Sequence, residues 1–139
     1  MIVADASAVA ELLLARPAAP AIREVLADHA ELHVPEHFHV EVLSVLRRYA
    51  VRRELSERRA AVALDALAEL RAIRYPVIEL LDPVWELRDS LTANDAAYLA
   101  LARRLDADLV TLDASLAGAA RAEHRLVELA SPPGDRARP

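Results

Sequence analysis

Several residue types are scarce or missing in this 139-residue sequence, and each absence excludes a class of protein. Cysteine is absent, which excludes disulfides and thiolate metal sites and is compatible with a reducing, cytoplasmic compartment. Lysine is also absent, because all 17 basic residues are arginine, and this excludes Walker-type phosphate loops and Schiff-base chemistry. The two glycines are too few for a glycine-rich nucleotide loop. No apolar run reaches the roughly 18–20 residues of a membrane span, so we expect no membrane contact.

The length and the charge narrow the class further. A chain of 139 residues is long enough for one domain with a sizeable core. The net charge of −5 argues against non-specific coating of nucleic acid but leaves room for a local basic rim. We expect no signal peptide, since Asp5 and Glu11 interrupt the first apolar segment. We predict a single domain over residues 1–130 and a disordered tail, "SPPGDRARP", over residues 131–139.

Short strand-like runs alternate with longer helical patterns along the chain. The runs typical of strands cover residues 2–4, 32–34, 77–80, 109–112 and 126–129. The helical patterns cover residues 18–27, 35–53, 56–73, 83–90, 94–105 and 114–120. Pro35 stands at a plausible first helical position. The alternation predicts an α/β domain with a mainly parallel, five-stranded sheet flanked by helices.

Four acidic residues stand at positions where a sheet of this kind gathers ligands. Asp5 in "VADAS" and Asp113 in "LVTLDAS" follow predicted strands, and Asp95 opens a helix in "LTANDAAYLALA". Glu41 lies inside the helix "PEHFHVEVLSVLRRY" at the border of its apolar stripe. Ligands of open parallel sheets bind beyond the carboxyl ends of the strands. The four side chains could therefore meet in one cleft.

Each acid also has a structural explanation. Asp5 and Asp113 could simply be N-caps of the helices that follow, and Thr92-x-x-Asp95 resembles a capping box. Taken one at a time, capping is the better interpretation of these three. Glu41 fits it less well, because no basic residue stands three or four positions after it and His37 could pair with it only weakly.

The combination of four acids favours a metal site. Carboxylates in a confined space repel one another unless a cation intervenes. An all-oxygen ligand set suits Mg²⁺ or Mn²⁺, which can lower the pKa of a bound water and offset charge on a phosphodiester oxygen. The chemistry that this pattern predicts is metal-dependent hydrolysis of phosphodiester bonds.

The sequence also resembles the PIN-domain ribonucleases, and within them the VapC-type toxins of bacterial toxin–antitoxin pairs. The resemblance rests on "IVADASA", "VEVLSVLRRY" and "LTANDAAYLALARRLDADLVTLDASLA", and it weakens after Asp113. It implies a five-stranded parallel sheet, Mg²⁺ or Mn²⁺, a homodimer, an RNA substrate and inhibition by a small antitoxin. It also implies functions for particular residues: metal-binding catalytic acids at Asp5, Glu41, Asp95 and Asp113, and supporting hydroxyl groups at Ser7 and Thr111.

Other polar residues extend this prediction. Asn94 could contact a metal-bound water. "RRYAVRRELSERR" places six arginines across the end of one helix and the start of the next. Most of them suit a solvated face, but one or two could contact RNA phosphates, and we select Arg47 and Arg48 as substrate-binding candidates.

The sequence leaves three alternatives to the nuclease. His37 and Glu41 could form part of a zinc site, but the sequence has no HExxH motif. Phosphoryl transfer to a strand-end aspartate is a weak alternative, because lysine is absent and "DAS" lacks a second aspartate. The remaining alternative is a catalytically inactive PIN-like module that binds RNA or protein.

Overall fold

The computed structural model describes residues 1–130, so the tail predicted over residues 131–139 lies outside the described part. In chain order the elements are β1 (Ile2–Ala4), α1 (Ala6–Leu13), α2 (Ala19–Ala27), β2 (Leu32–Pro35), α3 (Phe38–Val51), α4 (Glu57–Glu69), β3 (Ile73–Tyr75), the 3₁₀ helix η1 (Val77–Leu80), α5 (Leu81–Glu86), α6 (Ala93–Leu105), β4 (Asp108–Val110) and α7 (Ala114–Ala122).

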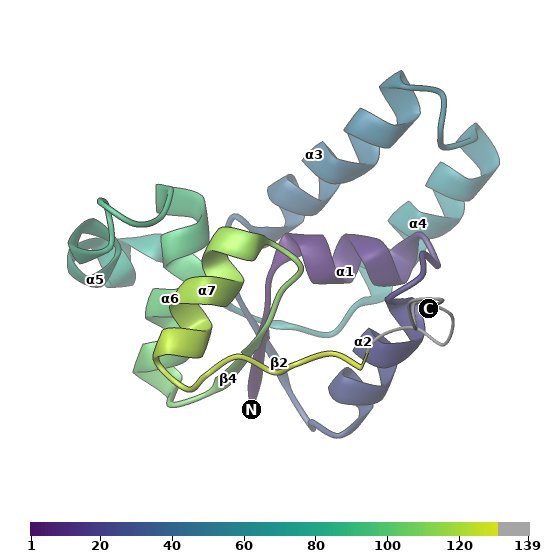
Figure 1. Ribbon diagram of the computed structural model, residues 1–139. Helices are drawn as coiled ribbons and strands as arrows, with labels where there is room; N and C mark the ends of the chain where they lie inside the picture. Colours follow the sequence, from purple (N-terminus) through teal and green to yellow (C-terminus); the bar gives the residue numbers. More distant parts are fainter. Residues whose placement is uncertain (131–139) are drawn as a thin grey trace, which may run out of the picture.

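The centre of the molecule is a four-stranded sheet with the strand order β3-β2-β1-β4 (Figure 1). All pairings are parallel: Ile2 of β1 lies opposite Leu32 of β2 and opposite Asp108 of β4. The three residues of β1 are completely buried. An inner parallel strand has helices over both of its faces, which explains its continuous apolar sequence. The predicted α/β class with a parallel sheet is confirmed.

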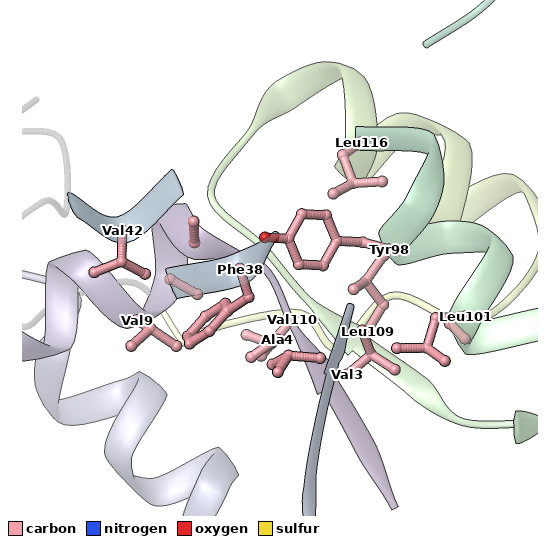
Figure 2. Close-up of a cluster of buried hydrophobic side chains, with 14 of the residues drawn as sticks. Val3, Ala4, Val9, Phe38, Val42, Tyr98, Leu101, Leu109, Val110 and Leu116 are labelled. Atoms are coloured by element: carbon pink, nitrogen blue, oxygen red, sulfur yellow. The ribbon is translucent and has the colours of Figure 1, made fainter. Parts of the chain in front are cut away.

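Helices cover the sheet on both sides. Figure 1 shows α5, α6 and α7 on one side of the strands and α1 and α2 on the other. α6 packs against β1, β2 and β4, and its residues 96–102 are all buried. Figure 2 shows the resulting core, in which Phe38 of α3 and Tyr98 of α6 pack beside Val3 and Leu109 of the sheet. Among residues 1–130, no helix is both long enough and apolar enough to cross a membrane.

α3 and α4 pack against each other and extend beyond the sheet (Figure 1). The buried residues of α3 recur every four positions, at Phe38, Val42 and Leu46, and form the stripe that packs on α1. Ser56 begins α4 by accepting a hydrogen bond from Arg59 N at 3.2 Å. Figure 1 shows the start of α3 near the sheet and its end away from it.

Two of the five predicted strands are wrong. Residues 77–80 form η1, and the strand in this region is β3, at Ile73–Tyr75. β3 is an edge strand with two of its three residues exposed, so its sequence carries no apolar run to reveal it. Residues 126–129 form only an isolated bridge between Leu126 and Leu109. The predicted helix over 56–73 accordingly ends at Glu69, before β3.

Pro35 does not begin a helix as predicted. It is the last residue of β2, and α3 starts at Phe38. Pro35 lies opposite Tyr75 of β3, and the next donor, Glu36 N, binds Tyr75 O at 2.8 Å. A proline is tolerated at this strand end because the ladder to β3 continues through the neighbouring residue.

Candidate active site

Asp5 stands at the carboxyl end of β1, where it is also the N-cap of α1. Its Oδ1 accepts hydrogen bonds from Ser7 Oγ at 2.6 Å and from Ala8 N at 3.2 Å. The capping interpretation is therefore correct for Asp5. The cap occupies one carboxylate oxygen, however, and Oδ2 has no hydrogen bond within residues 1–130.

The environment of Asp5 opposes its ionisation. The residue is only 4% exposed, and burial raises the pKa of its carboxyl from 3.8 to about 6. The hydrogen bonds from Ser7 and Ala8 and the nearby hydroxyl of Thr111 lower the pKa of this carboxyl, and the charge of Asp95 raises it further. No arginine or histidine forms an ion pair with Asp5 in the described part of the chain. A buried carboxylate without a cation is costly, so this position favours a positively charged ligand.

Ser7 and Thr111 connect the ends of β1 and β4. Ser7 Oγ accepts a hydrogen bond from Leu112 N at 3.0 Å and lies 3.5 Å from Thr111 Oγ1. Thr111 Oγ1 in turn accepts a hydrogen bond from Asp113 N at 3.0 Å. The two hydroxyl groups thus hold the backbone that carries Asp5 and Asp113, and their support of metal ligands stays a prediction.

Asp113 repeats at β4 the arrangement of Asp5 at β1. It is the N-cap of α7, and its Oδ1 accepts a hydrogen bond from Leu116 N at 2.8 Å. The side chain is half-buried. β1 and β4 are neighbouring parallel strands, so their terminal acids lie at the same edge of the sheet.

The carboxyl of Asp95 is influenced by the charges of the other acids. It belongs to the first turn of α6, where its N–H donates to Thr92 Oγ1 at 3.3 Å. Burial raises the pKa of Asp95, and the charges of Asp113 and Glu41 raise it further, while a hydrogen bond with Thr92 lowers it. Asp95 is therefore close enough to Asp5, Asp113 and Glu41 for their charges to act on one another's carboxyl pKa, with Asp95 as the shared neighbour.

Glu41 points from the first turn of α3 toward α6. Its Oε1 accepts a hydrogen bond from the hydroxyl of Tyr98 at 3.1 Å and lies 2.5 Å from His37 Nε2. His37 Nε2 also lies 3.3 Å from the carbonyl oxygen of Asn94, which joins α3 to the start of α6. His37 thus contacts Glu41 more closely than the weak pairing that the sequence suggested.

Tyr98 is a site residue that the sequence reasoning missed. Its ring is fully buried, and Figure 2 shows the hydroxyl oxygen directed from α6 toward α3. Burial and the charge of Glu41 raise the pKa of Tyr98 well above its usual value, so the hydroxyl keeps its proton and remains a donor. The available signal was a tyrosine three residues after Asp95 inside a run of alanine and leucine.

The donor set fits a divalent cation in its chemistry. The acids offer carboxylate oxygens and lack arginine partners within residues 1–130. No group of three or more histidine, aspartate or glutamate side chains in that range is close enough to form a ready-made metal site. Mg²⁺ is usually held by one or two carboxylates and several waters, so it does not need such a cluster. Metal binding by these residues stays a prediction.

The other candidates lie around the acids. A cavity of about 370 Å³ is lined by Glu41, Ser44, Val45, Arg47, Arg48 and Asn94. It brings Asn94 and both substrate-binding candidates beside one of the acids. Arg59, by contrast, donates to Leu14 O at 2.8 Å and has a structural role.

The zinc alternative finds no support among the described histidines. His29 contacts Val25 O, and His33 contacts the hydroxyl of Tyr75. Within residues 1–130, His37 is the only histidine that contacts one of the four acids. A zinc site needs more nitrogen, sulfur or carboxylate ligands around one point than this pair provides.

Comparison with known proteins agrees with this geometry. The family model described as PIN domain matches residues 2–122. Ribonuclease VapC12 of Mycobacterium tuberculosis is 38% identical over 117 residues, which cover 84% of this chain and 90% of that protein. Ribonuclease VapC9 of the same species is 41% identical over 123 residues, which cover 88% and 94%. The chain therefore belongs to the PIN-domain family and, within that family, to the VapC ribonucleases.

Solved structures agree on the fold. The crystal structure of Mycobacterium tuberculosis VapC20, described as a Sarcin-Ricin loop cleaving toxin, matches with a TM-score of 0.66 and 18% identity, covering 86% of this chain and 95% of that one. PAE2754 from Pyrobaculum aerophilum matches with a TM-score of 0.61 and 23% identity, covering 84% and 77%. At these identities the likeness concerns the fold alone.

Proposed function

We propose that the chain is a divalent-metal-dependent endoribonuclease that hydrolyses RNA phosphodiester bonds and acts as the toxin of a toxin–antitoxin pair. The observation that carries the proposal is the buried carboxylate of Asp5, which has a raised pKa and stands among Glu41, Asp95 and Asp113. The names of the relatives, which are ribonucleases, support the reaction class.

The four acids would hold Mg²⁺ or Mn²⁺, which supplies a water of lowered pKa and offsets charge on the phosphate. Asp5 is the central ligand, because β1 and the α1 cap hold it rigidly while Oδ2 stays available. Ser7 and Thr111 keep the Asp5 and Asp113 backbones in register. Asn94 would orient a water at the start of α6, and Arg47 and Arg48 would bind the substrate from the adjoining cavity.

The proposal extends to the partners and the location. A VapC-type toxin would pair with a small cognate antitoxin and form a homodimer, and it would act in the cytoplasm. The nuclease domain would span residues 1–130. These statements rest on the family and on the cysteine-free composition.

The test is an incubation of the purified protein with structured RNA and Mg²⁺ or Mn²⁺. We expect cleavage that EDTA abolishes and that Asp5→Asn and Glu41→Gln each lower by at least about 100-fold, because each removes a charge from the cation site. Circular dichroism of the variants checks that the fold is kept. Undiminished cleavage by Asp5→Asn would contradict the assignment, and RNA binding without cleavage by the wild type would favour the inactive binding module.

A further inference from the structure

A second cavity, of about 270 Å³, lies between α1 and α3. Its lining combines basic, aromatic and apolar side chains: Ser7, Ala10, Glu11, Leu14, Arg16, Val45, Arg48, Tyr49, Arg52 and Leu112. Arg48 lines it from the last turn of α3, Arg52 from the C-cap of the same helix, and Arg16 from the segment after α1. Three arginines thus face one hollow in a chain whose net charge is −5.

Of these three arginines, Arg16 has structural partners, whereas Arg48 and Arg52 have none within residues 1–130. Arg16 pairs with Glu11 at 3.3 Å and lies over the ring of Tyr49, with 4.8 Å between its guanidinium carbon and the ring centroid. Arg48 and Arg52 are exposed and form no ion pair or side-chain hydrogen bond within residues 1–130. Arg48 lies in the last turn of α3 and Arg52 is its C-cap, so two like charges stand four positions apart at the end of the helix and repel each other. An anionic ligand would remove this repulsion.

The second cavity adjoins the acidic site. Ser7, which donates to Asp5, lines its wall together with Leu112, the residue before Asp113. Arg48 and Val45 line both this cavity and the one that contains Glu41 and Asn94. A ligand at the acids can therefore continue along α3 into the second cavity.

We propose that the cavity between α1 and α3 binds the phosphates of the RNA strand next to the phosphate at the acids, through Arg48 and Arg52 with Arg16 at its end. This inference rests on the proposed function, because an RNA strand with one phosphate at the acids carries further phosphates into the adjoining cavity. Arginine suits this role, since its planar fork binds phosphate oxygens in pairs. The strand would run along α3 toward its C-terminal end.

The test measures RNA binding and not cleavage. The affinity of a fluorescently labelled single-stranded RNA is measured by anisotropy against salt concentration, in the Asp5→Asn background with constant Mg²⁺. We expect Arg48→Ala/Arg52→Ala to raise Kd about tenfold or more and to reduce the slope of log Kd against log salt by about 1.4, because each lost phosphate contact on a single strand contributes about 0.7. RNAs of different sequence should lose affinity equally.

Matched controls separate this site from general charge. Arg23→Ala/Arg71→Ala removes the same charge from two exposed arginines, of which Arg23 lies on α2 and Arg71 precedes β3, and neither lines the second cavity. We expect its slope to stay within about 0.3 of the parent. Arg48→Lys/Arg52→Lys keeps the charges, so it should keep the slope while losing part of the affinity.

Each outcome decides the inference. Equal losses in the two alanine pairs, or unchanged RNA affinity in Arg48→Ala/Arg52→Ala, would overturn it. Loss of binding to a labelled oligoglutamate peptide with unchanged RNA affinity would assign the cavity to an acidic protein partner instead. Arginine-dependent RNA binding by a chain that never cleaves RNA would contradict the proposed function alone, and RNA cleavage with unaltered affinity in the variant would contradict this inference alone.

Discussion

The carboxylate of Asp5 illustrates how one side chain serves structure and function together. As an N-cap it uses Oδ1, and as the candidate ligand it offers Oδ2. Capping was the better interpretation of Asp5 taken alone, and the structure confirms the cap. The cap does not account for the burial, because capping residues are commonly solvated while Asp5 is 4% exposed. The burial is what favours a cation.

The raised pKa of Asp5 predicts an inverted pH dependence of stability. Between about pH 4 and pH 6 the folded state keeps a proton that the unfolded state has lost, so the free energy of unfolding falls as the pH rises. The change from 3.8 to about 6 costs the metal-free folded state about 3 kcal/mol at pH 7, since one pKa unit corresponds to about 1.4 kcal/mol. Urea titrations in EDTA measure this.

Asp5→Asn should remove that cost. An asparagine is neutral and still caps a helix, so we expect the variant to be up to about 3 kcal/mol more stable than the wild type at pH 7 in EDTA. Asp65→Asn, at an exposed position of α4, is the control and should change stability by less than about 0.5 kcal/mol. A less stable Asp5→Asn protein under these conditions would show that the carboxylate is not a strained group.

The hydroxyl of Tyr98 is the other residue-scale prediction. Tyr98→Phe keeps the buried ring and removes only the donor to Glu41. We expect it to fold normally but to bind Mn²⁺ about 10-fold or more weakly in calorimetric titrations, because partners that orient a ligand commonly contribute this much. Tyr75→Phe, whose hydroxyl contacts His33 instead, should leave Mn²⁺ affinity unchanged. Equal affinity in Tyr98→Phe and the wild type would restrict Tyr98 to a packing role.

The sequence predicted the four acids but not their immediate partners. A strand followed by aspartate and a helix pattern is a local signal, and it located Asp5 and Asp113. The contact between Glu41 and Tyr98 joins residues 57 positions apart. No local pattern encodes a contact of that kind, because it depends on how α3 and α6 meet over the sheet.

At the scale of elements, the apolar patterns located what is buried and missed what is exposed. β1 is an inner strand, and β4, at one edge of the sheet, is covered by α6. Both strands were predicted closely. β3 is an exposed edge strand, and the apolar run after it forms η1. Tertiary contacts, and not local propensity, decide such short segments.

α6 carries both Asp95 and Tyr98, so its N-terminus sets their position. Thr92 is its N-cap, and replacing it by alanine leaves the Asp95 N–H without this partner. We expect Thr92→Ala to lower the free energy of unfolding by about 1 kcal/mol in urea titrations. Ser90→Ala changes an exposed hydroxyl two residues earlier and should be nearly neutral. Similar values for the two variants would contradict the capping role.

At the scale of the whole molecule, parallel topology explains how distant acids meet. β1 and β4 are neighbours in the sheet although more than 100 residues separate Asp5 from Asp113. His37 joins Glu41 of α3 to the start of α6, where Asp95 lies. Arg47 and Arg48 of α3 and its C-cap Arg52 line the two neighbouring cavities. The fold thus places these arginines beside the four acids in a protein whose net charge is −5.

The central claim is that the four acids form one divalent-cation site that acts on RNA. The most direct measurement is the rate of RNA cleavage against Mn²⁺ concentration for the wild type, Asp95→Asn and Asp113→Asn. We predict a rate that rises with Mn²⁺ and saturates in the wild type, and that falls at least about 100-fold in each variant even at saturating Mn²⁺. Cleavage that is independent of Mn²⁺, or that either variant retains in full, would contradict the claim.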